Sequence, residues 1–306
     1  MQSRFLWFAA VMIGIVAPCA AYRLGDGSTP VPKYTIKLDR PWHVGQTDHY
    51  QGHFKHVQKQ VVTQNGSVVH DITDFREFVC EVRERVVQVS GKGRPTQTRV
   101  HFIAFRGRFS SQGELNPLPL QGATVLVTLL PKATFQRSDG RKLDKDDLAF
   151  LNQLYAGSSA GSPTGNDDAL DPPGPVAVGE TWKGDAAVTA GQMTQGSSSK
   201  TAVSPSDVAS NFTLAEKRTV NGVDCLVVNG SIDMDHFVIP GLDGASGKAH
   251  TTLSKTVPVD PAKQEQAVVV DAEATIKGAI PTPDGRQELT ITTTDHQETL
   301  HLGQAQ

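Results

Sequence analysis

Asn65-Gly66 stands between two valine-rich runs in the stretch KQVVTQNGSVVHD at residues 59–71. Asn and Gly adopt positive φ readily, and a two-residue hairpin turn of type I′ needs that conformation at both central positions. The stretch therefore predicts a tight antiparallel hairpin. Its turn is expected to set Val62 opposite Val69 and His56 opposite Phe75, which decides the face on which each side chain of the hairpin lies.

Strand-type runs rich in Val, Ile, Phe and Thr recur along the chain. They are TRVHFIAF (98–105), ATVLVTLL (123–130), DCLVVNGSIDMDHFVI (224–239), AVVVDAEATIKG (267–278) and ELTITTTDHQETL (288–300). Alternation in the third of these runs predicts that Ile232, Met234 and Val238 share one face of a strand.

One segment has helical spacing instead. Asp144 is typical of an N-cap, and apolar residues follow at intervals of three and four: Leu148, Leu151, Leu154 and Tyr155. A Gly-, Ser- and Pro-rich stretch at 156–174 is typical of a linker, and 191–207 is loop-like as well. We therefore expect a mainly β fold of two tandem, curved antiparallel sheets, each a half-barrel-like unit, with one short helix and one linker.

The segment P-x-x-V-G-x-T occurs twice, at 41–47 and at 175–181, and an Asp-Gly-Arg turn follows each copy, at 139–141 and 284–286. This shared order predicts a duplicated unit. The expected divisions are a signal peptide at 1–21, a first β-rich repeat with a terminal helix at 22–155, a linker at 156–174 and a second β-rich repeat at 175–306.

The repeated motif has a structural interpretation. The prolines favour an extended entry, the valines are expected to pack inward, the glycines permit a bend and the tryptophan is expected in the core: Pro41, Val44, Gly45, Pro175, Val178, Gly179 and Trp182. A phosphate-binding loop needs several glycines at defined spacing. The motif therefore predicts a repeated structure, and the ligand-binding residues stay unknown.

The N-terminus has the three-part layout of a secretory signal peptide. Arg4 precedes the apolar run FLWFAAVMIGIV, and small residues follow up to Ala21. This run is short for a membrane span, which needs about 20 residues. We expect cleavage after Ala21 and export to the periplasm or the medium. Lipid attachment at Cys19 would change this, but Val16 and Pro18 fit a lipobox poorly.

The charge balance excludes one class of partner. The formal net charge is -3, and the chain lacks a run of basic residues. A nucleic-acid-binding protein carries a basic patch, so we expect no nucleic-acid partner. Contact with a membrane is expected only if Cys19 is lipidated.

Cys80 and Cys225 lie in strand-type runs, one in each half of the chain. In an oxidising compartment the two thiols can pair as a disulfide. Alternatively, each cysteine fills a core position as a small apolar side chain. The sequence leaves both possibilities open, because a disulfide needs Cα atoms within about 7 Å of each other.

Four histidines and one acid gather between residues 43 and 56: His43, Asp48, His49, His53 and His56. On a helix, His49, His53 and His56 would share one face and could approach one metal ion. On the strand that the hairpin predicts, His49 and His53 lie about 13 Å apart. We therefore predict no metal site and no cofactor, and histidines that are solvated or singly hydrogen-bonded.

Motifs of known catalytic chemistry are missing from the sequence, which contains neither H-E-x-x-H nor C-x-x-C. GSSAG at 157–161 lies in the expected linker, where no scaffold would hold an oxyanion hole. Asp233, Asp235 and His236 suggest an acid/base cluster, but alternation sends both acids to one face and His236 to the other. We predict no catalytic residues and no enzymatic activity.

The signal peptide, the motif PVAVGETW and the Asn-Gly and Asp-Gly turns resemble those of secreted β-rich proteins of bacterial envelopes. Those proteins carry a P-V-x-V-G-[DE]-x-W element that opens a strand-rich half. The resemblance covers mainly residues 172–306 and implies no established activity, so it assigns no functional residues. The layout is also similar, more distantly, to the curved sheets of periplasmic lipoprotein carriers.

Two functional hypotheses follow. The first is a non-catalytic secreted or periplasmic binding or scaffold protein of the cell envelope, which holds an apolar ligand or a protein partner on a concave sheet. The second is a metal-binding or hydrolytic enzyme that uses the histidines and acids of the regions 43–56 and 233–236.

Overall fold

The computed structural model describes residues 31–38, 40–91, 93–129, 133–155, 170–196, 202–238, 243–264, 266–282 and 285–303. The expected signal peptide, with Cys19, and residues 156–169 of the expected linker lie outside these ranges. The elements are β1 (Lys33–Tyr34), β2 (Thr47–Gln64), β3 (Ser67–Val89), β4 (Pro95–Arg108), β5 (Asn116–Pro117), β6 (Thr124–Thr128), β7 (Thr134–Arg137), α1 (Lys145–Leu154), β8 (Val176–Ala177), β9 (Thr181–Trp182), α2 (Ala186–Gly196), β10 (Ala202–Val203), a 3-10 helix (Pro205–Asp207), β11 (Val208–Val220), β12 (Val223–Val238), β13 (Asp243–Pro258), β14 (Ala267–Thr282) and β15 (Gly285–Gly303).

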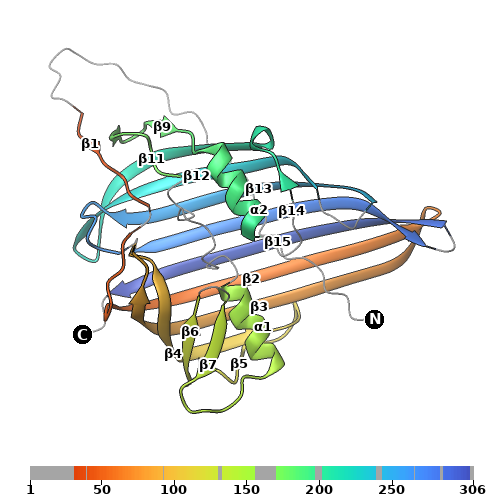
Figure 1. Ribbon diagram of the computed structural model, residues 1–306, viewed down its shortest axis with the longest axis horizontal. Coiled ribbons are helices and arrows are strands. Elements are labelled where there is room, and N and C mark those ends of the chain that lie inside the picture. The colour runs from red at the N-terminus through yellow and green to blue at the C-terminus, as the bar shows by residue number, and fades with distance from the viewer. Residues whose placement is uncertain are drawn as a thin grey trace.

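Most of the strands form one broad antiparallel sheet, whose order is β7-β6-β4-β3-β2-β15-β14-β13-β12-β11-β9 (Figure 1). β5 adds to β4 and β10 adds to β12, which makes 13 strands, while β1 and β8 pair separately. The mainly β, antiparallel fold expected from the sequence is confirmed. The two halves of the chain meet edge to edge, because β2 pairs with β15, so both contribute to one larger sheet.

Tight Asn-Gly turns make two of the hairpins. Asn65 and Gly66 have φ of 51° and 77°, and Asn221 and Gly222 have φ of 50° and 76°. These values are the type I′ geometry that favours the right-handed twist of paired strands. The first turn joins β2 to β3, as predicted from the sequence, and the second joins β11 to β12.

The register expected beyond the first turn is wrong by one residue. Val62 pairs with His70 and His56 pairs with Arg76. The cause is a β-bulge between Val62 and Thr63, which inserts one extra residue into β3. A bulge of this kind leaves no local trace in the alternation of valines around the turn.

Both copies of P-x-x-V-G-x-T form the same turn. Gly45 has φ of 87° and Gly179 has φ of 88°. In each copy the residue after the glycine donates its N–H to the carbonyl two residues before the glycine, at 3.1 and 3.0 Å respectively. Positive φ at the third position of such a turn is the type II geometry, which favours glycine.

Each turn also docks on a bulged strand in the same way. The glycine N–H donates to the carbonyl of Val86 in β3 at 2.9 Å in the first copy, and to that of Leu214 in β11 at 2.7 Å in the second. The N–H of the same strand residue donates back to the residue after the glycine. The motif thus repeats a local structure. The duplication of whole halves stays a prediction.

The prediction that the motif valines pack inward is wrong. Val44 and Val178 are 64% and 45% exposed, because they occupy the outer corner of the turn. Trp182 is buried, as expected, and its Nε1–H donates to the carbonyl of Leu170 at 2.8 Å. Its ring lies 5.9 Å from that of Phe212, centroid to centroid.

Two helices cover one face of the sheet, which is called the inner face below (Figure 1). Helix α1 begins as predicted, with the N–H of Asp147 donating to Oδ1 of Asp144 at 2.7 Å. Helix α2 extends from residue 186 into the stretch 191–207 that was expected to be a loop, so that expectation is wrong over 191–196. Asp185 caps it through the N–H groups of Ala187 and Val188. Neither helix is long and apolar enough to cross a membrane, nor is any other helix in the described ranges.

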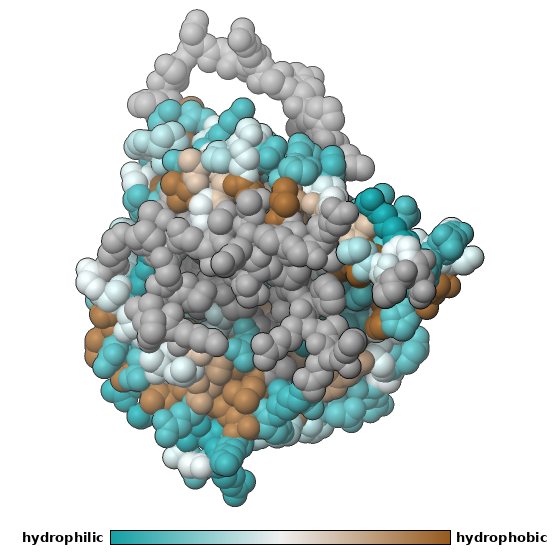
Figure 2. All heavy atoms as spheres, turned by 45° about the vertical axis from the view of Figure 1, so that its right-hand side comes forward, coloured by the Kyte–Doolittle hydropathy of each residue, from teal (hydrophilic) through white to brown (hydrophobic). Residues whose placement is uncertain are grey.

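The inner face carries two separate apolar cores. The buried members of the first-half core in the described ranges lie between residues 78 and 155, with Phe78, Phe102 and Phe105 of the sheet packed against Phe150 of α1. The second-half core contains side chains of β11–β15 with Ala190 of α2. Apolar side chains that remain exposed appear as patches among hydrophilic ones on the visible side of the molecule (Figure 2).

An N-terminal strap, residues 33–38 with Arg40, completes the second-half core. Ile36 and Leu38 are buried within it. The guanidinium of Arg40 anchors the strap, because it donates to the carbonyls of Lys37, Pro258 and Asp260 at 2.7, 2.8 and 2.9 Å. Two of these carbonyls belong to the end of β13 and the turn that follows it, so Arg40 fixes the strap to this end of β13.

The possible disulfide between Cys80 and Cys225 does not form. Both cysteines are buried as free thiols, Cys80 in β3 and Cys225 in β12. Four strands separate β3 from β12 in the sheet, which places the two thiols about 24 Å apart along it at about 4.8 Å per strand. Burial raises the pKa of the Cys80 thiol to about 12 and also raises that of Cys225.

Glycines make room for phenylalanine rings on the neighbouring strand. Gly230 of β12 pairs with Phe212 of β11, and Gly247 of β13 pairs with Phe237 of β12. A Cβ atom at either glycine would overlap the ring opposite it. The two rings therefore lie flat over the backbone of the next strand, which only glycine permits.

We expect Gly230→Ala to lower the free energy of unfolding by about 1–3 kcal/mol, because the Phe212 ring must leave its position in a packed core. Urea unfolding followed by tryptophan fluorescence measures this. Gly191→Ala in α2 is the control: a Cβ there meets open space, and alanine favours the helix by about 0.5–1 kcal/mol. Equal stability of Gly230→Ala and the wild type would contradict the packing described.

We also expect both buried thiols to resist a disulfide reagent such as DTNB at mildly alkaline pH, since neither is accessible as a thiolate. After unfolding in guanidinium without reductant, Cys80 and Cys225 should both react. A sample unfolded with reductant gives the total number of thiols per chain. Fewer reactive thiols in the sample unfolded without reductant would contradict the expectation and show a disulfide.

Candidate metal centre on the outer face of the sheet

Histidines on the outer face, opposite the helices, each contact a carboxylate of the neighbouring strand. His49 Nε2 lies 2.8 Å from Oε1 of Glu81, and His53 Nε2 lies 2.9 Å from Oε1 of Glu77. Two further pairs on this face are His296 Nδ1 with Asp271 Oδ1, at 2.7 Å, and His250 Nδ1 with Asp233 Oδ1. Such a contact orients the imidazole, because one ring nitrogen is held by the carboxylate and the other points away from it.

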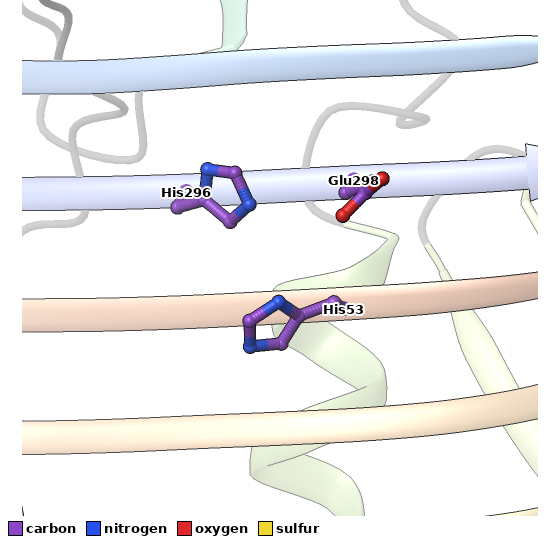
Figure 3. Close-up of side chains that lie close together, drawn as sticks. All are labelled: His53, His296 and Glu298. Atoms are coloured by element: carbon purple, nitrogen blue, oxygen red, sulfur yellow. The ribbon is translucent and has the colours of Figure 1, made fainter.

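Three side chains converge on this face at the junction of β2 and β15. They are His53, His296 and Glu298, and one potential ligand atom of each lies within 4.8 Å of the other two (Figure 3). Register explains the convergence: Glu298 is the direct partner of His53, and His296 lies two residues along the same strand. The two imidazole centroids are 5.4 Å apart.

Carboxylates on the flanking strands hold both rings. Glu77 of β3 engages Nε2 of His53, and Asp271 of β14 engages Nδ1 of His296. The other ring nitrogens, Nδ1 of His53 and Nε2 of His296, are therefore turned into the space shared with Glu298, as Figure 3 shows. A carboxylate behind each imidazole is the arrangement that accompanies metal-bound histidine.

Arg108 of β4 in turn holds Glu77. Its Nε donates to Oε2 of Glu77 at 2.7 Å. Burial by itself raises the pKa of Glu77, but the hydrogen bonds from His53 and Arg108 outweigh it and hold this pKa below its usual range. Glu77 is thus a carboxylate near neutral pH and accepts the proton of His53 Nε2.

The donor set suits a transition-metal ion of the zinc type. Two neutral imidazole nitrogens and one carboxylate oxygen are common Zn²⁺ ligands, whereas Ca²⁺ and Mg²⁺ prefer sets made of oxygen alone. Both histidines are half-buried and Glu298 is exposed, so further coordination positions face solvent.

The histidines predicted as one group are dispersed. His43 is exposed in the first motif turn, His49 and His53 lie on the outer face, and His56 lies on the inner face. His56 Nδ1 contacts Oδ1 of Asp295 at 2.6 Å, across the β2–β15 junction. The inference from strand spacing that these histidines do not share an ion among themselves agrees with this arrangement.

Asp48 lies at the inner-face end of the same junction. It is 4% exposed and contacts Nδ1 of His301, itself 6% exposed, at 2.6 Å. Tyr50 Oη donates to Oε2 of Glu84 nearby, at 3.4 Å. Burial raises the pKa of Glu84, and the negative charge of Asp48 raises it further, against the hydrogen bond from Tyr50.

The Asp233, Asp235 and His236 group does not form a cluster. Asp233 contacts His250, and Asp235 lies 3.6 Å from the ammonium of Lys248. His236 is exposed, and it is not set on the face opposite the acids as predicted, because a register shift between Met234 and Phe237 interrupts the alternation.

The same shift makes the predicted position of Val238 wrong. Phe237 is buried in its place, and Val238 is 44% exposed.

His101, in the strand β4, contacts Oγ1 of Thr124 at 3.0 Å.

Sequence reasoning missed His296, Glu298 and their partner Asp271. The stretch DHQET at 295–299 does carry a trace, because alternation places His296 and Glu298 on one face of a strand. What the sequence lacks is any local sign that β15 pairs with β2, whose residues lie more than 200 positions earlier.

No protein-family model matches the chain, and no curated protein matches its sequence. A solved structure of lipovitellin is 8% identical to this chain, with a TM-score of 0.37. The match covers 86% of this chain and 25% of the lipovitellin chain, so this chain spans about a quarter of the length of lipovitellin. DynF from the dynemicin biosynthesis pathway of Micromonospora chersina is 10% identical with a TM-score of 0.19, covering 97% and 96% of the two chains. An outer membrane channel from Pseudomonas putida F1 is 11% identical with a TM-score of 0.19, covering 85% and 97%. Similarities this weak assign no function.

We expect Glu84→Gln to become more stable relative to the wild type as pH rises. With its raised pKa, native Glu84 keeps its proton at pH values where the unfolded chain, with a pKa of about 4.3, has lost it. Wild-type stability therefore falls as pH rises from that value through the folded pKa, and the variant escapes this loss. Urea unfolding between about pH 4 and pH 8 measures the difference. Glu114→Gln, on an exposed loop, is the control, and a pH-independent difference for Glu84→Gln would contradict the expectation.

Proposed function

We propose that the chain is an exported, non-catalytic protein of the cell envelope that binds a zinc-type divalent metal ion through His53, His296 and Glu298. One observation carries the metal-binding part: the free nitrogens of two imidazoles and one carboxylate converge, and a carboxylate on a flanking strand orients each imidazole. Ligands that are held in this way need little reorganisation to receive an ion.

The export and envelope part rests on the sequence. The N-terminal layout is that of a secretory signal peptide, and the motif PVAVGETW resembles that of secreted β-rich envelope proteins. The location is the periplasm or the medium. Two free cysteines, both deeply buried, are compatible with an oxidising compartment, because thiols without access do not oxidise.

The surroundings of the ligands favour binding over catalysis. The three side chains project from the outer face of the sheet, and Glu298 is exposed. Hydrolytic metal sites lie in clefts whose walls exclude water and position the substrate. An ion on an open strand surface can instead serve storage, structure or the attachment of a partner, which fits a scaffold.

The version with an apolar ligand on the inner face has less support. The apolar side chains of that face are already buried in two cores, against α1, α2 and the N-terminal strap. A hollow of about 460 Å³ lies elsewhere and is lined mostly by charged residues and prolines: Lys37, Asp171, Pro172, Pro173, Lys183, Gly184 and Asp185.

Titration of the purified, chelator-treated protein with Zn²⁺ in a calorimeter tests the proposal. We expect saturation at one ion per chain, and loss of this binding in His53→Gln, His296→Gln and Glu298→Gln. Asp271→Asn, which removes a carboxylate behind a ligand, is expected to weaken binding by about 10–100-fold.

His49→Gln is the matched control, since His49 lies on the same strand and face and also contacts a carboxylate. This variant should bind Zn²⁺ as the wild type does. Wild-type protein that takes up no Zn²⁺, or binding that survives all three ligand substitutions, would exclude the site. Zinc-dependent hydrolysis of ester or peptide substrates would contradict the non-catalytic part.

A further inference from the structure

The junction between β2 and β15 joins the two halves of the chain within the large sheet. On the β2 side all strands come from residues 47–137, and on the β15 side all come from residues 181–303. The ladder runs from Gln287 paired with Gln64 to Gly303 paired with His49. Its partners are far apart in sequence, so closing the junction costs more chain entropy than closing either flanking hairpin.

Apolar packing contributes little across this junction. The first-half core lies wholly on one side of it, and Val62 is the strand residue of the first half that joins the second-half core. Polar pairs link the two strands instead on the inner face: Asp48 with His301 and His56 with Asp295, both at 2.6 Å. Along the ladder itself, β2 and β15 are therefore joined mainly by backbone hydrogen bonds and ionisable side chains, while the strap supplies the apolar contact between the halves through Ile36 and Leu38.

The candidate metal ligands straddle the same junction on the outer face. His53 belongs to β2, while His296 and Glu298 belong to β15. Their supporting carboxylates come from the next strands outward, Glu77 from β3 and Asp271 from β14. An ion at this point would therefore connect side chains anchored on four consecutive strands, two from each half.

We infer that metal binding acts as a clasp that controls opening of the β2–β15 junction. This inference rests on the proposed metal site. The ion binds only when the two strands are paired, because neither strand alone supplies all three ligands, so binding shifts the equilibrium toward the closed junction. In the absence of metal the junction opens more often than the hairpins on either side. The frequency of this local opening therefore falls as the metal concentration rises.

Hydrogen–deuterium exchange followed by mass spectrometry tests the clasp. The chelator-treated protein is compared with and without Zn²⁺ at about 100 times its measured Kd, where opening of a structure that binds only when closed falls about 100-fold. We expect this slowing in peptides from β2 and β15. Peptides from the β11–β12 hairpin, residues 208–238, should exchange at the same rate in both states.

Glu298→Gln, an exposed position that the fold tolerates, should show the metal-free exchange pattern with or without Zn²⁺. His49→Gln should behave as the wild type. If calorimetry shows Zn²⁺ bound while β2 and β15 exchange unchanged, or while the whole sheet slows equally, the clasp is overturned and the metal site stands. If calorimetry shows no Zn²⁺ binding, the proposed function and the clasp both fail.

Discussion

Pairing between β2 and β15 is the interaction on which the rest of the structure depends. Without it the chain would form two smaller sheets, each with a long unpaired edge strand that invites association with other chains. With it, one register brings together side chains from both ends of the sequence on both faces. The convergence of His53 with His296 and Glu298, and that of His56 with Asp295, are consequences of this single alignment.

The two faces of the sheet differ in what covers them. The inner face is filled from one end by α1 and from the other by α2 and the strap. The outer face carries paired histidines and carboxylates, beside exposed apolar side chains such as Val79 and Leu300. Ionisable side chains are common on a solvent-facing sheet surface, and strand register brings three of them, His53, His296 and Glu298, together as a candidate metal site.

Local chemistry made part of this structure predictable. The Asn65-Gly66 hairpin, the Asp144 cap of α1 and the bend at both motif glycines follow from conformational preferences of single residues. The bulge beside Val62, the shift beside Phe237 and the outward valines of the motif depend on packing with distant strands, so periodicity alone misplaced them. Of the three candidate metal ligands only His53 was named from the sequence, because the other two are brought beside it by a strand pairing between residues more than 200 positions apart.

The strap places a condition on the order in which the protein can be completed. A chain that emerges N-terminus first can close the first-half core as soon as residue 155 is available, since every member of that core lies before it. The second-half core needs Ile36 and Leu38 from the start of the described chain and β15 from its end. Ile36 and Leu38 therefore cannot take their final places until the last strand is made, so the second half is the part most open to misfolding during synthesis.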